Sequence, residues 1–292
     1  MRPALLLVLY AGMASAQDSG ERLLAEADAA YRSLRAADAV ALYREYLAGH
    51  RDRADVRVFL GGALLNLGQL EAALDEANHA IALDRGYAKA YILAGRVSSA
   101  RERWGPAQEF YQTAERLAPR DPEAWYFSGR AFFDANRFDR AVEAFQQARR
   151  FGAEQSRVYE NLGLAQEALG DFPAAEKSLR QAVTLAGGAS RPYVAYGGFL
   201  YRQGRAAESV PPLRQAVALE PASEDARFEL ARALYQENNL AEASRVLEPA
   251  LPAGMCRVRN LMLRIYSASG KTDLAEAQVR AMGDCKSPSG HP

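Results

Sequence analysis

The stretch that decides the fold runs from residue 122 to residue 155 and reads PEAWYFSGRAFFDANRFDRAVEAFQQARRFGAEQ. Bulky Trp125 and Phe145 stand at its positions 4 and 24, and small Gly129 and Ala141 stand at positions 8 and 20. Positions 4, 8 and 11 recur at helical spacing, as do positions 20, 24 and 27. Small residues let two backbones approach, and bulky residues fill the remaining space. The stretch therefore predicts two amphipathic helices packed against each other.

The same spacing returns every 34 residues along the chain, counted from Gly20. Position 20 of successive blocks is Ala39, Ala73, Ala107, Ala141, Ala175, Ser209, Ala243 and Ala277. Position 8 is Ala27, Gly61, Gly95, Gly129, Gly163, Gly197, Ala231 and, as a departure, Ile265. One helix pair cannot bury its apolar face alone, so the blocks are expected to stack as a repeat array.

The predicted array covers residues 17–286 and contains eight blocks, with no insertion between them. Their bounds are 20–53, 54–87, 88–121, 122–155, 156–189, 190–223, 224–257 and 258–286. We expect one continuous body without an internal domain boundary, followed by a disordered tail over 287–292.

The pattern resembles the tetratricopeptide repeat family over residues 20 to 286. Pro119 and Pro221 at position 32 add to the residues of the fourth block. The resemblance implies an all-α fold, a right-handed superhelical solenoid of antiparallel helix pairs. It also implies that the array holds a protein or peptide partner, although this fold serves many functions.

Further positions of the blocks predict local features of the helices and of the turns between them. Gly68, Gly170 and Gly204 at position 15, with Asn136 and Asn238 in two other blocks, tolerate a left-handed helix end. Pro211 and Pro212 fall inside the second helix of block six, which predicts a kink or a late start there. Block eight carries Arg264 and Asp284 at packing positions, as expected of a capping repeat.

The first 16 residues predict a secretory signal. Arg2 precedes an apolar run from Ala4 to Gly12, and Ala14-Ser15-Ala16 forms a small-residue exit before Gln17. We expect cleavage after Ala16 and a periplasmic or extracellular protein. The run is short for a membrane span, and no later segment approaches the required length, so no transmembrane segment is expected.

The composition argues against several functional classes. Lysine plus arginine and aspartate plus glutamate both number 36, so no net basic charge would attract nucleic acid. His50, His79 and His291 lack metal-ligand spacing, and neither a Gly-x-Ser-x-Gly elbow nor a phosphate-binding glycine loop occurs. We expect neither metal nor cofactor. The repeats also fill the sequence, which leaves no separate catalytic domain, and we expect no enzyme.

Family resemblance places positions 2, 5, 6, 9, 12 and 13 of each first helix on the concave groove. The aromatic, arginine and related residues there form the candidate partner site: Phe59, Ile92, Arg96, Tyr126, Phe127, Arg130, Phe133, Asn161, Arg191, Tyr201, Arg202, Phe228, Arg232 and Tyr235. Aromatic and arginine side chains are favoured interface anchors. The alternative is that several of these aromatic residues pack within the array.

Some relatives hold a peptide's terminal carboxylate with donors at defined groove positions. Arg130, Asn161 and Arg191 match three of those positions, whereas Tyr126 and Ala195 occupy the other two. The match to these relatives is therefore partial. It implies a partner with an acidic residue or a C-terminal carboxylate.

The two cysteines flank the last helix pair. Cys256 precedes its first helix and Cys285 ends its second, so a hairpin would bring them together. An exported protein permits a disulfide, which would stabilise the array by about 3.6 kcal/mol at most. The alternative is two free thiols.

Two functional classes remain. The first is a non-catalytic scaffold exported across the inner membrane, with a partner held in the groove. The second is a structural subunit of an envelope assembly, such as a secretion, pilus or polysaccharide-export complex.

Overall fold

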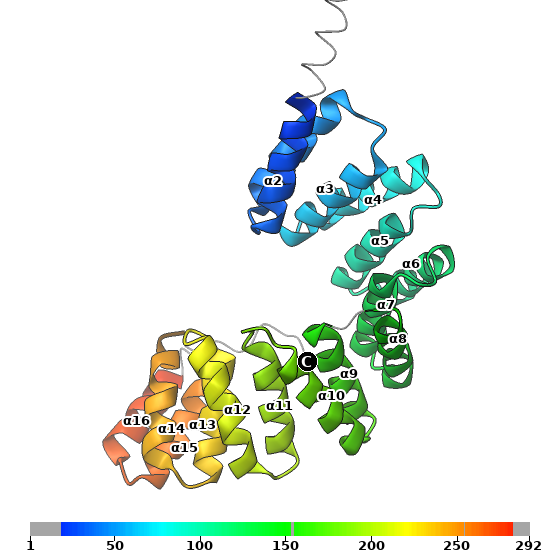
Figure 1. Cartoon of the computed structure of the whole chain (residues 1–292). Coiled ribbons are helices and arrows are strands. Elements are labelled where there is room, and N and C mark those ends of the chain that lie inside the picture. Colours follow the sequence, from blue (N-terminus) through cyan, green and yellow to red (C-terminus); the bar gives the residue numbers. More distant parts are fainter. Residues whose placement is uncertain (1–18, 153–154, 254, 283–292) are drawn as a thin grey trace, which may run out of the picture. The chain divides into compact units, whose positions relative to one another are not determined.

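The computed structural model describes residues 19–152, 155–253 and 255–282. The chain divides between residues 153 and 154 into two compact units, termed unit 1 and unit 2 (Figure 1). The regular 34-residue register predicted no boundary, so this division is a finding of the structure. Each unit is all-α and is built from consecutive helix pairs.

Unit 1 begins with helical residues 19–32, which pair with the next helix. The helices that follow are α2 (Ala36–Gly49), α3 (Ala54–Asn66), α4 (Leu70–Leu83), α5 (Ala88–Ala100), α6 (Trp104–Leu117), α7 (Pro122–Asp134) and α8 (Phe138–Arg150). The helices pack in sequence as α3 with α4, α5 with α6, and α7 with α8.

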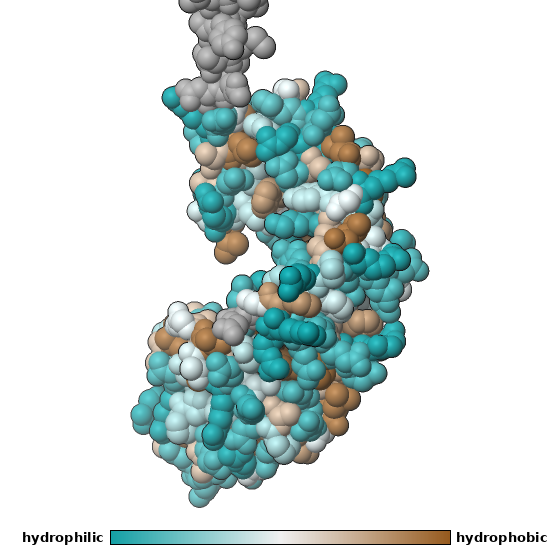
Figure 2. Space-filling model, turned by 45° about the vertical axis from the view of Figure 1, so that its right-hand side comes forward, coloured by the Kyte–Doolittle hydropathy of each residue, from teal (hydrophilic) through white to brown (hydrophobic). Residues whose placement is uncertain are grey.

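Unit 2 repeats the same arrangement. Its elements are α9 (Ser156–Ala168), α10 (Phe172–Thr184), α11 (Arg191–Arg202), α12 (Ala206–Leu219), α13 (Glu224–Gln236), α14 (Leu240–Leu247), the short 3-10 helix η1 (Glu248–Ala253), α15 (Cys256–Ala268) and α16 (Thr272–Ala281). Hydrophilic side chains cover most of the visible surface of both units, and the apolar patches there are small and separate (Figure 2).

The turn inside each helix pair contains one residue in the left-handed region. These residues have φ between 57° and 81°, and they are Leu34, Gly68, Glu102, Asn136, Gly170, Gly204, Asn238 and Gly270. The left-handed helix ends predicted at the three glycines and two asparagines are thus confirmed. In the turn after α3, the N–H of Gln69 donates to the Leu64 carbonyl at 2.9 Å, which closes the helix end.

Glycine at position 8 permits close approach to the bulky residue at position 24 of the same pair. A Cβ added to Gly95 would lie 2.6 Å from Tyr111, and one added to Gly129 would lie 2.7 Å from Phe145. Tyr111 and Phe145 are both fully buried. The small-beside-large pattern predicted from the sequence is therefore the packing of the pair.

A recurring hydrogen bond that the sequence did not reveal joins successive pairs. The residue at position 4 donates to the carbonyl oxygen six residues earlier, in the turn between pairs, at 2.8–3.3 Å. The bonds are Arg57 to Arg51, Tyr91 to Arg85, Trp125 to Pro119 and Arg227 to Pro221. Position 4 of these four pairs therefore takes a long side chain with a donor at its end.

The last repeat begins two residues earlier than the sequence register predicted. Its first helix starts at Cys256 instead of residue 258, and its turn residue is Gly270. Ala275 is buried, whereas Ala277, assigned to the small packing position, is partly exposed. The reason is that α14 ends at Leu247 and continues as η1, which shortens the preceding repeat.

The prolines of block six do not delay their helix. α12 starts at Ala206, at the same register position as α4 and α10, and both Pro211 and Pro212 lie inside it. The predicted late start is wrong. Ser209, which replaces alanine at position 20, is fully buried and donates its hydroxyl to the Ala206 carbonyl at 2.7 Å.

Three predictions lie outside the described residues: the signal segment 1–16, the tail 287–292, and Cys285 with its disulfide to Cys256. Among the helices that the structure does describe, none is long and apolar enough to cross a membrane.

Candidate functional site

The first helices of successive pairs in unit 1 lie beside one another. α5 contacts both α3 and α7, so that the three present a common face. Two pockets lie on this face and share Arg96. We call the lining of these two pockets the α3–α5–α7 face.

The larger of the two pockets has a volume of about 250 Å³. Its walls are Leu65, Arg96, Ser99, Ala100, Tyr111, Phe127, Arg130, Ala131 and Asp134. The guanidinium carbon of Arg96 lies 4.8 Å from the centroid of the Phe127 ring, within cation–π range. Tyr111 forms the floor, where its hydroxyl lies 3.3 Å from Ser99 Oγ. Burial raises the pKa of Tyr111, so the phenol stays neutral.

The smaller pocket, of about 90 Å³, is more enclosed. It is lined by Tyr31, Val58, Phe59, Lys89, Ile92, Leu93, Arg96 and Glu123. Phe59 lies 5.9 Å from Tyr31, ring centroid to ring centroid, in an edge-on arrangement, and 39% of Phe59 is exposed. An aromatic surface and a cation therefore meet at this point.

The charges of the α3–α5–α7 face are only partly balanced. Arg130 lies 3.9 Å from Asp134, and burial raises the pKa of Asp134 against the opposing effect of Arg130. Within the described residues, no carboxylate pairs with Arg96 or with the exposed Lys89. Two cations of this face are thus available to an anionic group.

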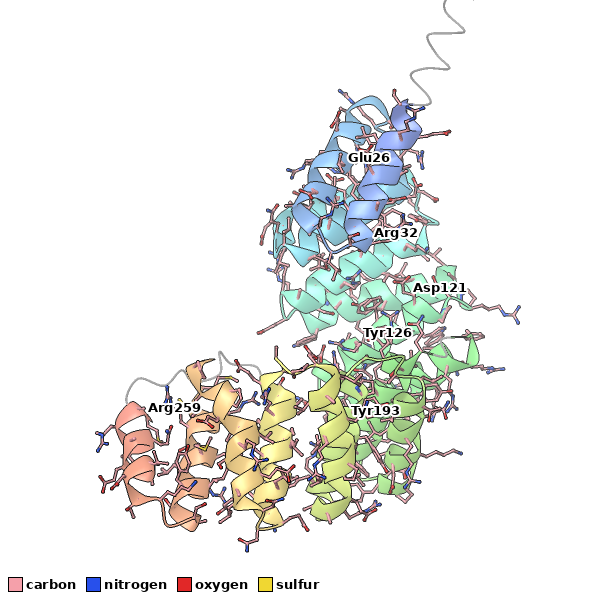
Figure 3. All side chains as sticks on the ribbon, turned by 60° about the vertical axis from the view of Figure 1, so that its left-hand side comes forward. Glu26, Arg32, Asp121, Tyr126, Tyr193 and Arg259 are labelled. Carbon is pink, nitrogen blue, oxygen red and sulfur yellow. The ribbon has the colours of Figure 1, made fainter. Side chains whose placement is uncertain are left out.

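Not every predicted groove residue reaches the surface. Ile92 and Tyr126 are buried, and Tyr126 packs edge-on against Phe127 at 5.2 Å between ring centroids. Figure 3 shows Tyr126 on α7, one turn beyond Asp121, whose side chain caps this helix by accepting from the Glu123 N–H. Phe133 packs against Phe138 at 5.4 Å between ring centroids. The packing alternative therefore describes Tyr126 and Phe133 better.

The corresponding face of unit 2 carries arginines that are already paired. Arg191 donates to the buried Glu160 at 2.6 Å, and Arg202 donates through two nitrogens to Glu167 at 2.7 and 2.8 Å. Arg232 pairs with Glu229, which lies on the same helix. Burial raises the pKa of Glu229, and Arg232 opposes this shift. The predicted cationic surface is thus neutralised by acidic residues of the chain itself.

The aromatic rings of this face are covered as well. The guanidinium carbon of Arg232 lies 4.1 Å from the centroid of Tyr201. That of Arg257 lies 4.9 Å from Phe228, and that of Arg264 lies 5.0 Å from Tyr235. Arginine and aromatic side chains, expected to contact a partner, here contact each other.

The three donors of the partial carboxylate motif differ in their surroundings. Asn161 is buried and donates its amide to the Arg157 carbonyl of its own helix at 2.7 Å. Arg191 is paired with Glu160, and Arg130, in unit 1, lies near Asp134. Arg130 belongs to unit 1 and the other two donors belong to unit 2, so a joint carboxylate site stays a prediction.

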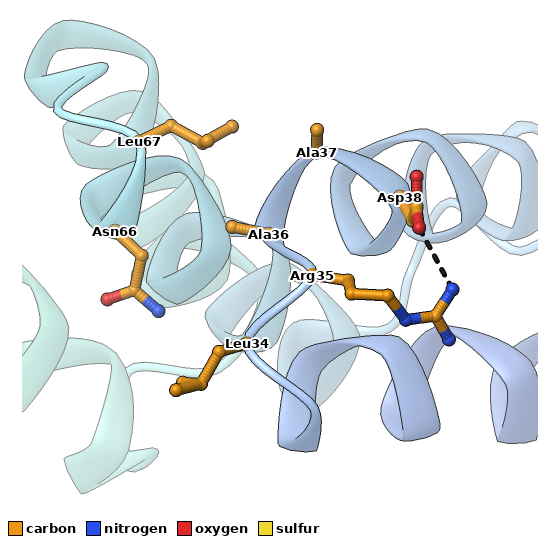
Figure 4. A pocket seen from close by; sticks show the side chains of 7 residues that line it. All are labelled: Leu34, Arg35, Ala36, Ala37, Asp38, Asn66 and Leu67. Carbon is orange, nitrogen blue, oxygen red and sulfur yellow. Dashed lines mark hydrogen bonds and ion pairs between the residues drawn. The ribbon is translucent and has the colours of Figure 1, made fainter.

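Two further pockets lie away from the first-helix faces. One, of about 600 Å³, lies at the turn after the first helix, between exposed Leu34 and Leu67 (Figure 4). Arg35 and Asp38 both line it, and Arg35 donates to Asp38 at 2.9 Å (Figure 4). The other, of about 710 Å³, adjoins Trp125. Across the described ranges, no cluster of histidine, cysteine and carboxylate side chains could hold a metal ion.

Successive helix pairs, each with a left-handed turn and most with a small residue beneath a bulky one, define a helical-hairpin repeat protein. Sequence models described as tetratricopeptide repeat match residues 24–88, 92–156, 129–190 and 200–255. The chain belongs to the tetratricopeptide repeat family. No curated protein gives a significant sequence match.

Solved structures show the same fold at low sequence identity. The Cut9–Hcn1 hetero-tetramer of APC/C matches with a TM-score of 0.68 and 17% identity, over 89% of this chain and 52% of that chain. Yeast Tom70 matches with 0.62 and 17%, over 89% and 56%. A thermophilic TPR protein of Thermus thermophilus matches with 0.55 and 23%, over 63% and 100%. The chain thus spans about half the length of the first two proteins.

Proposed function

We propose that this protein is a non-catalytic scaffold that binds a protein or peptide partner on the α3–α5–α7 face of unit 1. The observation that carries the proposal is the pair of pockets that meet at Arg96, a cation without an acidic partner in the described part of the chain. Membership of the tetratricopeptide repeat family supports a binding role.

The chemistry of this face indicates the kind of segment that fits. An acidic side chain or a terminal carboxylate would pair with Arg96 and Lys89, and a neighbouring apolar side chain would enter the pocket beside Phe127. Unit 2 offers less, because its groove arginines Arg191, Arg202 and Arg232 already have carboxylate partners. The proposed partner site therefore involves the first four repeats instead of the whole array.

Affinity capture from the source organism tests this proposal. The Lys89→Gln/Arg96→Gln variant removes the two available cations and keeps a polar side chain at each position. The Arg103→Gln/Lys177→Gln variant removes the same charge from exposed positions outside the face. We expect the wild type and the second variant to capture a partner that the first variant loses. Retention of every partner by the first variant would refute the site.

We further propose that the protein acts after export, in the periplasm or outside the cell. The support is the charged start, apolar run and small-residue exit of the first 16 residues. N-terminal sequencing of the mature protein should begin at Gln17. A mature chain that still begins at Met1 would contradict export through this signal.

A further inference from the structure

The pocket beside Trp125 shares no residue with the α3–α5–α7 face, and its chemistry is different. It is lined by Glu109, Gln112, Thr113, Glu115, Arg116, Pro119 and Trp125. The indole N–H of Trp125 donates to the Pro119 carbonyl at 3.0 Å. This bond holds the ring in place as one wall of the pocket.

Glu115 departs from the pattern of its position. The equivalent residue of four other repeats is apolar and partly buried, namely Ile81, Val183, Val217 and Leu251. A half-buried carboxylate in this place costs stability through desolvation. Burial accordingly raises the pKa of Glu115, although Ser128 opposes the shift.

Ser128 departs in the same way at the next position inward. Its counterparts Leu60, Ala94, Leu162 and Leu230 are buried apolar residues, and Ser128 itself is buried. Ser128 Oγ and Glu115 Oε1 are both shielded from solvent without a well-formed hydrogen bond in the described chain. Two polar side chains that interact mainly with each other therefore stand where other repeats have apolar packing.

The carboxylates of the pocket also lack a cation. Neither Glu109 nor Glu115 forms an ion pair within the residues that the structure describes. The neighbouring Arg116 donates instead to Thr113 Oγ1 at 3.0 Å. An indole face next to two unpaired carboxylates is suited to a guanidinium or ammonium group, through cation–π and charge-assisted contacts.

We infer that this pocket, hereafter the Trp125 pocket, binds an arginine or lysine side chain of a protein partner. The cation would lie against the Trp125 ring and pair with Glu115 and Glu109. The inference does not depend on the α3–α5–α7 face, whose chemistry favours the opposite charge. One scaffold would then hold an acidic segment on one side and a basic segment on another.

Fluorescence of Trp125 tests the inference directly. The chain has two tryptophans, so Trp104→Phe leaves Trp125 as the reporter. The probe is a short capped peptide with one central arginine, and its twin carries neutral citrulline instead. We expect a saturable fluorescence change with the arginine peptide and at least about tenfold weaker binding of the twin. No saturable change, or equal binding of both peptides, would overturn the inference.

Variants separate this binding role from a structural one. Glu115→Gln keeps the shape and should weaken arginine-peptide binding about tenfold or more, whereas Glu45→Gln, at an exposed position of α2, should leave it unchanged. Glu115→Val introduces the apolar residue type of the four other repeats, so it should abolish binding while raising Tm. If the Glu115→Val variant still binds the arginine peptide, the site is contradicted. A lower Tm of this variant would contradict it as well. Methylguanidinium that binds as tightly as the peptide would contradict a protein occupant.

Discussion

Glu102 illustrates how a single residue can be strained by a repeat that otherwise suits its sequence. It takes the left-handed turn position with φ of 57°, where its counterparts other than Leu34 are glycine or asparagine. A side chain there costs about 1–2 kcal/mol. Glu102→Gly should therefore stabilise unit 1 by up to about 1 kcal/mol in urea unfolding, after the greater flexibility of unfolded glycine is subtracted.

The matched control reverses this change. Gly68 has φ of 72°, and no atom lies within 4 Å of an added Cβ, so Gly68→Ala tests backbone strain alone. We expect a loss of about 1 kcal/mol. Equal stability of both variants and the wild type would show that the turn tolerates any residue.

Gly129 tests the packing of a helix pair. A Cβ would lie 2.7 Å from the buried Phe145 ring, so Gly129→Ala should cost about 1–3 kcal/mol. Gly105, at the exposed start of α6, has no atom within 4 Å of an added Cβ. Gly105→Ala should be neutral or stabilising by up to about 1 kcal/mol. The account fails if the two substitutions have the same effect on thermal unfolding.

At the residue scale, the sequence predicts the packing positions better than it predicts the turn residues. Gly129, Ala141 and Phe145 could be placed because small and bulky types alternate at fixed positions. Leu34 and Glu102 could not be recognised as turn residues, since neither type favours positive φ. Their positions follow only from the 34-residue spacing.

At the element scale, α12 shows that tertiary packing can overcome an unfavourable sequence. Pro211 and Pro212 lie in its interior, where each removes a backbone donor. Pro211 is exposed, so Pro211→Ala restores an N–H without changing the core. We expect stabilisation by about 1–3 kcal/mol in urea unfolding. Gln215→Ala, on the same helix, should change the free energy of unfolding by no more than about 0.5 kcal/mol. If it stabilised the protein as much as Pro211→Ala, the gain would come from the helix propensity of alanine.

Element boundaries were predictable while the repeat length stayed constant. The second helices from α2 to α14 begin at the same register position, which the sequence pattern predicts. The start of the last pair was predicted wrongly, because α14 ends early and η1 takes fewer residues than the rest of a full second helix would. Ala277 and Ala275 are both alanines two positions apart, so the sequence pattern did not indicate that the register of the last pair shifts.

At the scale of the molecule, the candidate site was only partly predictable. Groove positions identified Arg96, Phe127 and Arg130, which the structure brings to one pocket. The ion pairs of the unit 2 arginines were not predicted, because the predicted groove contains aromatic and cationic residues but no acidic ones. Glu160, Glu167 and Glu229 lie on first helices of the same unit, and counting both charges would have indicated neutralisation.

A disulfide between Cys256 and Cys285, expected from the sequence, would close the last helix pair. If Cys256 pairs with Cys285, the denatured, unreduced protein should show no reactive thiol, and reduction should lower Tm by destabilising the last helix pair. A Cys256→Ser/Cys285→Ser variant should reproduce the lower Tm without reductant. Two reactive thiols in the unreduced protein would dismiss the bridge.

Site-specific photo-crosslinking in the source organism tests the binding face most directly. Ala100, exposed at the end of α5, lines the larger of the two pockets on the α3–α5–α7 face, and Gln236 occupies the equivalent exposed position on α13 of unit 2. A photoreactive residue at position 100 should form an adduct with the partner, and one at position 236 should form none. Adducts from position 236 alone, or equal adducts from both, would contradict a partner site on the α3–α5–α7 face.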